Sequence, residues 1–86
     1  MKLIWDEKAW EEYEYWQGQD KKTLKKINRL IKSIQRNRYE CEGKPERLKH
    51  DKCDLWSVEI DSFNRMMFFI EKNTLNIVSC RGHYDN

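Results

Sequence analysis

The chain has 86 residues, a length that suits one domain, residues 1–86. Although 37% of its residues are charged, basic residues exceed acidic ones by only two, so the net charge points to no class of partner. The three cysteines match no metal-ligand spacing, and no phosphate-binding glycine loop or paired histidines occur, so we expect reduced thiols and neither a metal nor a cofactor. Neither a signal peptide nor an apolar stretch of about 18 residues is present, which predicts a cytoplasmic protein without a membrane partner.

The first half of the chain predicts a strand followed by two helices. The apolar run at residues 2–5 favours a strand, and Asp6 is a good N-cap for a helix over residues 7–17. Gly18 is expected to end that helix, and Asp20 to cap a second, longer one. The apolar stripe of this second helix consists of Leu24, Ile27, Leu30, Ile31 and Ile34.

The two predicted helices differ in the sign of their charge. Residues 6–20 hold six acidic residues and one lysine, whereas residues 21–38 hold eight basic residues and no acidic one. Such a basic segment suits contact with phosphates or with an acidic protein, and it is also typical of a solvated helix face.

After the helices the chain predicts an irregular connection and then strands. Residues 39–54 contain Gly43 and the only proline, Pro45, so we expect an irregular segment with room for one short extended piece. Apolar and polar residues alternate over residues 55–60, which predicts a half-buried strand, and a turn is expected at residues 61–64.

The end of the chain predicts a hairpin and completes the fold class. Residues 66–70 are continuously apolar, which favours a central strand covered on both faces, and Lys72-Asn73 favours a turn into a last strand over residues 75–81. The order of elements predicts an α+β fold in which two N-terminal helices pack on one face of a mainly antiparallel sheet and leave the other face for function.

Three ionisable residues are expected to converge once these strands lie side by side. They are Glu46 after the proline, Arg65 before the central strand and His83 after the last strand. Cleavage of RNA by its own 2′-hydroxyl needs a base, positive charge on the phosphorane and an acid for the 5′-oxygen, and these residue types can fill those roles without a metal. Each also has a structural interpretation, as a solvated loop charge, a strand-end ion pair and a surface histidine.

Short motifs spread along the chain carry a resemblance to a known family. They are Met1-Lys2-Leu3-Ile4-Trp5, Tyr15-Trp16, Asp20-Lys21, Lys25-Lys26-Ile27-Asn28, Gly43-Lys44-Pro45-Glu46, Leu48-Lys49-His50, Trp56-Ser57, Arg65 and His83-Tyr84. On these motifs the chain resembles the YoeB branch of the RelE/ParE superfamily of bacterial toxins. The resemblance implies a fold akin to small microbial ribonucleases and cleavage of messenger RNA in the ribosomal A site.

The resemblance also implies partners and residue roles. The expected partners are a cognate antitoxin similar to YefM, the ribosome and its messenger RNA, and a homodimer is allowed. Because its charges are clustered while the net charge is small, the basic segment at residues 21–38 is expected to face ribosomal RNA. Glu46 matches the family's general base, Arg65 its phosphate-stabilising group and His83 its general acid. The resemblance implies that Lys49 and Tyr84 contact RNA. Lys44 and Arg81 are also expected to contact RNA.

Three positions depart from the family pattern. Val58 and Glu59 stand where members usually carry two arginines, and Asn64 stands where they carry a histidine. Glu59 is expected on the open side of the sheet near Arg65, where a carboxylate would repel phosphate. Either these changes attenuate cleavage, or their charge is offset elsewhere, for example by Arg47. Two functions therefore stay open, an endoribonuclease and a non-catalytic module of the same fold that binds antitoxin or ribosome.

Overall fold

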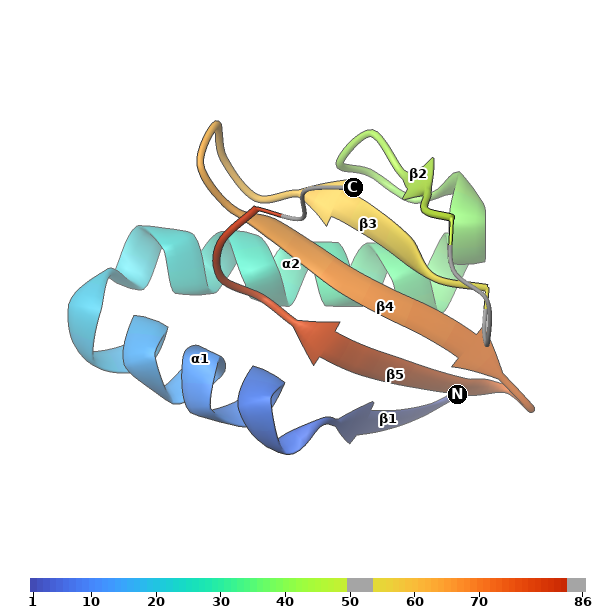
Figure 1. Ribbon diagram of the computed structural model, residues 1–86, viewed down its shortest axis with the longest axis horizontal. Helices are drawn as coiled ribbons and strands as arrows, with labels where there is room; N and C mark the ends of the chain where they lie inside the picture. The colour runs from blue at the N-terminus through green and yellow to red at the C-terminus, as the bar shows by residue number, and fades with distance from the viewer. Residues whose placement is uncertain (50–53, 84–86) are drawn as a thin grey trace.

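The computed structural model describes residues 1–49 and 54–83 as a layer of helices on a five-stranded sheet (Figure 1). The elements are β1 (Lys2–Trp5), α1 (Glu7–Gln19), α2 (Lys21–Asn37), the 3₁₀ turn η1 (Arg38–Glu40), β2 (Glu46–Arg47), β3 (Trp56–Glu59), β4 (Arg65–Glu71) and β5 (Thr74–Ser79). The strand order is β1-β5-β4-β3-β2, with β1 parallel to β5 and the other neighbours antiparallel. The predicted α+β class with a mainly antiparallel sheet is confirmed.

Asp20 separates the two helices and caps the second, as predicted. Its carboxylate accepts hydrogen bonds from the backbone nitrogens of Lys22 and Thr23 and from the Thr23 hydroxyl. The expected end of α1 at Gly18 is wrong, because the backbone N–H of Asp20 donates to Trp16 O at 3.0 Å and the helix continues through the glycine to Gln19. The extended backbone of Asp20, with φ of −156°, is what ends the helix.

One hydrophobic core lies between the helices and the sheet. The predicted stripe of α2 is confirmed at Ile27, Leu30, Ile31 and Ile34, while Leu24 is only partly buried. The strand residues that face this stripe are Val58, Met66, Phe68, Leu75 and Ile77. From α1 the core receives Ala9 and Trp16. None of the described helices is long and apolar enough to cross a membrane.

The helices leave one face of the sheet open. In Figure 1 this open face is turned toward the viewer, and α2 lies behind the sheet. Met66 and Phe68 of β4 are fully buried on the helix side, whereas Met67 and Phe69 alternate onto the other side and stay partly exposed. The expectation that this strand is covered on both faces is therefore wrong, since both helices pack on one side. The predicted hairpin is confirmed: Lys72 and Asn73 both have positive φ, as a two-residue turn of type I′ requires.

The last strand ends two residues earlier than the predicted Arg81. The backbone N–H of Cys80 donates to Glu12 Oε1 at 2.8 Å, and Trp16 Nε1 donates to Cys80 O at 2.9 Å, so side chains of α1 replace the strand partners of this residue. The register of β4 and β5 also shifts between Met67 and Phe68. The chain after β5 is thus turned away from the sheet ladder and toward the start of β4.

Candidate active site

Arg65, the first residue of β4, is held on the open face of the sheet. Its Nε donates to Ser57 Oγ at 2.9 Å and its Nη2 donates to Lys44 O at 3.4 Å. The same nitrogen lies 3.8 Å from Glu46 Oε2, and only 13% of the arginine side chain is exposed. Residues of β3, β2 and the loop before β2 therefore fix the orientation of the guanidinium. A planar guanidinium with several fixed donors is well suited to bind phosphate oxygens.

Ser57 is a member of the site that sequence reasoning missed. It is fully buried and lies between its register partners Glu46 on β2 and Met67 on β4. A buried hydroxyl needs a hydrogen-bond partner, and the Arg65 guanidinium supplies one. The available signal was the position of Ser57 on the polar side of an alternating strand, but the pairing with Arg65 depends on strand register.

Glu46 approaches Arg65 from β2 and keeps most of its side chain in solvent. The glutamate side chain is 67% exposed. An exposed ion pair of this kind contributes about 1 kcal/mol or less, because solvent screens it. The carboxylate can therefore exchange its arginine partner for a substrate group at little cost.

The loop that carries Glu46 is fixed to the core by a glycine. Gly43 has φ of 93°, and a Cβ at this position would lie 2.8 Å from Leu30 Cδ2 and 3.0 Å from Val58 Cβ. Its carbonyl accepts a 2.7 Å hydrogen bond from the backbone N–H of Glu59. Only glycine meets both requirements, and the resulting path brings the Lys44 carbonyl and Glu46 to Arg65.

Two hydrogen bonds join the segment after β5 to the start of β4. The backbone N–H of Arg65 donates to Gly82 O at 2.9 Å, and the backbone N–H of Gly82 donates to Asn64 Oδ1 at 2.8 Å. The side-chain amide of Asn64 also donates to the Asp61 carboxylate, at 3.1 and 3.2 Å from its two oxygens. Asn64, which sequence reasoning treated only as a lost histidine, thus anchors the segment that carries His83.

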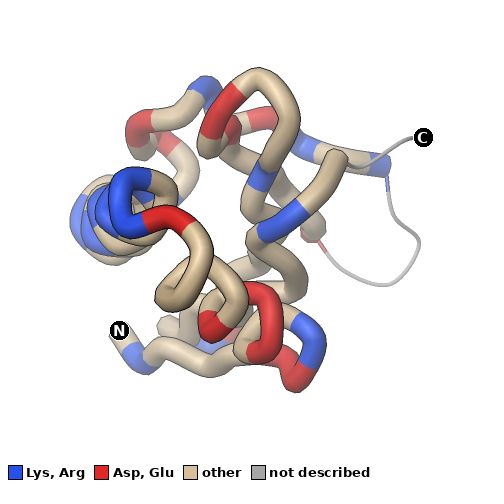
Figure 2. Tube along the Cα trace, turned by 90° about the vertical axis from the view of Figure 1, so that its left-hand side faces the viewer, with Lys and Arg blue, Asp and Glu red and all other residues tan. Residues whose placement is uncertain are grey.

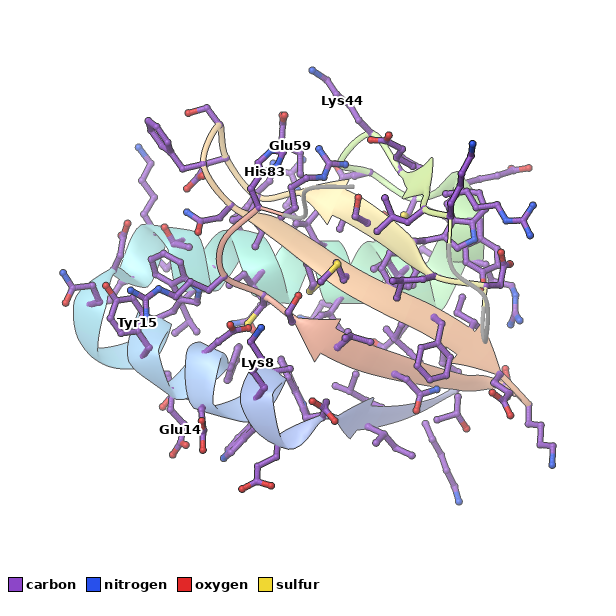
Figure 3. All side chains as sticks on the ribbon, in the orientation of Figure 1. Lys8, Glu14, Tyr15, Lys44, Glu59 and His83 are labelled. Atoms are coloured by element: carbon purple, nitrogen blue, oxygen red, sulfur yellow. The ribbon has the colours of Figure 1, made fainter. Side chains whose placement is uncertain are left out.

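The anchored segment places His83 in a pocket with Arg65. The lining residues are Lys8, Arg65, Met67, Ser79, Arg81, Gly82 and His83. Figure 3 shows His83 at the same end of the sheet as Lys44 and Glu59. Arg65 is therefore the common neighbour of the other two candidates: Glu46 forms an ion pair with it, and His83 lines the same pocket.

Glu59 lies on the open face, opposite Arg65 in the register of β3 and β4. Its carboxylate lies 3.9 Å from Lys44 Nζ, so Lys44 offsets its charge. Arg47, the residue expected to offset this charge, instead donates to Asp54 Oδ1 at 2.6 Å. Val58 is fully buried in the core and does not face the site, so Glu59 alone of these two residues can act on a bound phosphate.

The residues expected to contact RNA have different surroundings. Lys49 is exposed after β2, and Lys44 is exposed beside Glu59. The Arg81 guanidinium lies 3.7 Å above the centre of the Tyr15 ring, so it is partly engaged by α1. Tyr84 lies outside the described residues.

The basic helix α2 lies on the side of the sheet opposite this site. Its apolar stripe faces the core, and Figure 2 shows its basic positions on the side that faces away from the sheet. The residues that line a groove along this outer face are Lys25, Asn28, Arg29, Lys32, Ser33, Arg36, Asn37 and Glu42. Arg29 Nη2 donates to Glu42 Oε1 at 2.7 Å, and this contact lowers the pKa of the Glu42 carboxyl.

The two cysteines among the described residues add no nucleophile to the candidate active site. Burial raises the pKa of the Cys80 thiol to about 12 and also raises the pKa of Cys41, so neither is a nucleophile at neutral pH. Within residues 1–49 and 54–83 no three His, Cys, Asp or Glu side chains lie together as metal ligands.

Comparison with known proteins finds similar chains over nearly the full length. A family model described as "YoeB-like toxin of bacterial type II toxin-antitoxin system" matches residues 5–84. Toxin YoeB of Escherichia coli (strain K12) is 46% identical over 84 residues, which cover 98% of this chain and 100% of that protein. The YoeB dimer from Staphylococcus aureus is 40% identical with a TM-score of 0.90, and YoeB in a YoeB-YefM toxin-antitoxin complex from the same organism is 39% identical with a TM-score of 0.87; each covers 98% of both chains.

Proposed function

We propose that this chain, which belongs to the YoeB-like toxins of bacterial type II toxin–antitoxin systems, is an endoribonuclease that cleaves messenger RNA in the ribosomal A site. The observation that supports this best is the arrangement around Arg65, which forms an ion pair with Glu46 and shares a pocket with His83. A base, a fixed cation and an acid are the groups that metal-free cleavage by the 2′-hydroxyl requires.

In the proposed reaction Glu46 takes the proton of the 2′-hydroxyl, and the 2′-oxygen attacks the adjacent phosphorus. Arg65 binds the phosphate oxygens and stabilises the charge of the phosphorane. His83 gives a proton to the 5′-oxygen as the bond between phosphorus and that oxygen breaks. The products are a 2′,3′-cyclic phosphate and a 5′-hydroxyl, and no redox change occurs.

The contacts of Arg65 support a change of partner during this reaction. Ser57 and the Lys44 carbonyl hold the guanidinium without adding net charge. The exposed Glu46 carboxylate supplies the negative charge until a phosphate arrives. Once the phosphate takes its place, Glu46 remains beside the nucleotide as a free carboxylate, which is the form that a general base needs.

The proposal includes three assemblies of this chain: a complex with an antitoxin, a homodimer and a complex with the ribosome. The solved complex of the S. aureus relative with YefM makes an antitoxin of that type the expected inhibitor, and the solved dimer of its YoeB makes a homodimer the second assembly to test. The basic outer face of α2 is the surface proposed to face ribosomal RNA.

Single-turnover cleavage of messenger RNA on programmed ribosomes tests the reaction. His83→Ala and Glu46→Ala should each reduce the cleavage rate by about 10²- to 10⁴-fold, the usual contribution of general acid–base groups, with ribosome binding kept. Unchanged cleavage in both variants would contradict the proposal.

Glu59 favours a second candidate function, that of a non-catalytic binding module. Its carboxylate faces the proposed phosphate site and pairs with one of the cations there. A chain so attenuated that it no longer cleaves would act as a module that binds antitoxin or ribosome. Expression of the unmodified chain distinguishes the two: growth arrest with loss of reporter messenger RNA supports the enzyme, and ribosome binding without either supports the module.

A further inference from the structure

The pocket that holds His83 contains two cations, Lys8 and Arg81, to which the proposed reaction gives no step. Among the described residues, its ionisable lining residues are Lys8, Arg65, Arg81 and His83, and none of these is a carboxylate. Ser79, the other polar side chain of this lining, adds a hydroxyl. A pocket of this composition is suited to an anion rather than to a metal or a cationic ligand.

Lys8 reaches this pocket because α1 is tied to β5 at several points. The backbone N–H of Asp6, just before the helix, donates to Ile77 O at 2.9 Å, and Glu12 and Trp16 hold the backbone of Cys80 farther along. These contacts place the first turn of α1 beside the end of β5. Figure 3 shows Lys8 rising from α1 toward that end of the strand.

Lys8 differs from the other cations of the pocket because no charged or aromatic partner is found for it among the described residues. Arg65 is engaged by Glu46, and Arg81 lies over Tyr15. The ion pairs found within residues 1–49 and 54–83 do not involve Lys8. Its side chain is exposed, so its ammonium group is available to an incoming ligand.

The charges around Arg65 are unequal on its two sides. The β3 side carries the carboxylates of Glu46 and Glu59, the second of them paired with Lys44, whereas the pocket on the β5 side carries the cations of Lys8 and Arg81. A polyanion bound at Arg65 meets the Glu46 carboxylate on the first side and cations on the second. The cations that the described lining of the pocket offers to its next charge are Lys8 and Arg81.

We infer that Lys8 binds a phosphate of the RNA chain that flanks the phosphate held by Arg65. This inference rests on the proposed function, since it takes RNA as the ligand. Lys8 is a binding residue: it sets the direction in which the RNA backbone leaves the site, and it does not act on the reacting atoms.

The test uses a short RNA that carries a 2′-deoxynucleotide at the cleavage position and therefore cannot react. Its binding is measured for the unmodified chain, Lys8→Gln, Lys8→Arg and the control Lys2→Gln, which removes the same charge from the far end of β1. We expect Lys8→Gln to weaken binding roughly three- to tenfold and to lower the slope of log affinity against log salt by about 0.7, with Lys8→Arg close to the unmodified chain. Lys2→Gln should change neither quantity.

Methylphosphonate linkages then locate the contact, since each removes the charge of one phosphate. One flanking methylphosphonate should weaken binding by the unmodified chain but not by Lys8→Gln, because the charged partner is already absent from that variant. A purely structural role of Lys8 would not single out one phosphate.

The outcomes separate this inference from the proposed function. If Lys8→Gln and Lys2→Gln behave alike at every phosphate, or if the unmodified chain does not bind the RNA at low salt, the inference is wrong. If Lys8-dependent binding occurs but the unmodified chain does not cleave messenger RNA on ribosomes, the inference stands and the proposed enzymatic function is wrong.

Discussion

Glu59 and Arg65 lie opposite each other across β3 and β4, and each forms its ion pair with another residue. Glu59 pairs with Lys44 at 3.9 Å, and Arg65 pairs with Glu46 at 3.8 Å. Both partners come from the loop and short strand that Gly43 fixes to the core. The open face therefore carries two neighbouring acid–base pairs, and a phosphate that binds at Arg65 must compete with one carboxylate and approach the other.

Reversing the charge of Glu59 should raise cleavage. At an effective dielectric near 20, a unit charge about 6 Å from the phosphorane acts with a few kcal/mol, and exposure of this side chain reduces that effect. We expect Glu59→Arg to increase the single-turnover rate on programmed ribosomes about tenfold and Glu59→Gln to increase it less. Arginine at position 58 is not a useful companion change, because Val58 is fully buried and the substitution should destabilise the fold.

The same pair of variants decides the question of attenuation. If neither Glu59→Arg nor Glu59→Gln changes the rate, the Lys44 pair already cancels the effect of the carboxylate. The hypothesis that Glu59 attenuates this member of the family would then be wrong.

Loss of the Ser57 hydroxyl should impair cleavage through Arg65. Ser57→Ala removes the acceptor of a partly buried 2.9 Å hydrogen bond, and bonds to charged groups contribute about 1.5 to 3 kcal/mol. We expect a fall of roughly tenfold or more in the single-turnover rate, with ribosome affinity little changed. Arg65→Ala in the same assay gives the largest loss that Ser57→Ala could cause. A Ser57→Ala variant that folds and cleaves at the unmodified rate would show that Arg65 is positioned without it.

The parts of the fold that were predicted correctly depend on neighbouring residues. Asp20 bonds backbone groups two and three residues away, and Lys72-Asn73 forms a two-residue turn. Gly18 was misjudged because a glycine permits a helix to end without requiring it. Local sequence specifies caps and tight turns, so these features could be read before the structure was known.

The parts of the site that were missed depend on residues far apart in the chain. Ser57 meets Arg65 through the register of two strands, and Asn64 meets Gly82 across 18 residues. Lys8 enters the pocket because α1 holds the backbone of Cys80, through bonds that span 64 and 68 residues. No local pattern encodes such contacts, which is why the sequence named the candidate reacting groups and not the residues that hold them.

Removing the side chain of Asn64 should loosen the segment that carries His83. In Asn64→Ala the Gly82 N–H loses its acceptor, so its exchange with solvent deuterium should become faster. Cleavage should fall by about fivefold, because a net hydrogen bond contributes roughly 1 kcal/mol and the acid becomes less well placed. Hydrogen exchange read by NMR checks the first effect, with the amide of Ile77 in β5 as the internal control. Equal exchange of Gly82 in both proteins would show that Asn64 is not its anchor.

The buried thiols should resist alkylation in the folded protein. With the pKa of Cys80 raised to about 12, its thiolate fraction at pH 8 is on the order of 10⁻⁴, and burial also raises the pKa of Cys41. In a Cys53→Ser background, which leaves only these two thiols, we expect almost no reaction with a maleimide at pH 8 until denaturant is added. Fast modification of either thiol in the native protein would contradict the buried environment found here.

Neutralising basic residues of α2 should weaken ribosome binding without slowing the chemical step. The outer face of this helix lies opposite the candidate active site, so the two surfaces can be changed separately. Replacing Lys22, Lys25 and Lys26 with alanine removes three cations, and the slope of log affinity against log salt should fall by about two to three if all three contact RNA phosphates. Single-turnover cleavage at saturating ribosomes should stay close to that of the unmodified chain, in contrast to His83→Ala. A Lys2→Ala, Lys72→Ala variant controls for two of the three lost charges, since both lysines lie at the far hairpin end of the sheet. If the triple variant keeps the affinity and salt slope of the unmodified chain, the basic face of α2 is a solvated surface and the ribosome is bound elsewhere.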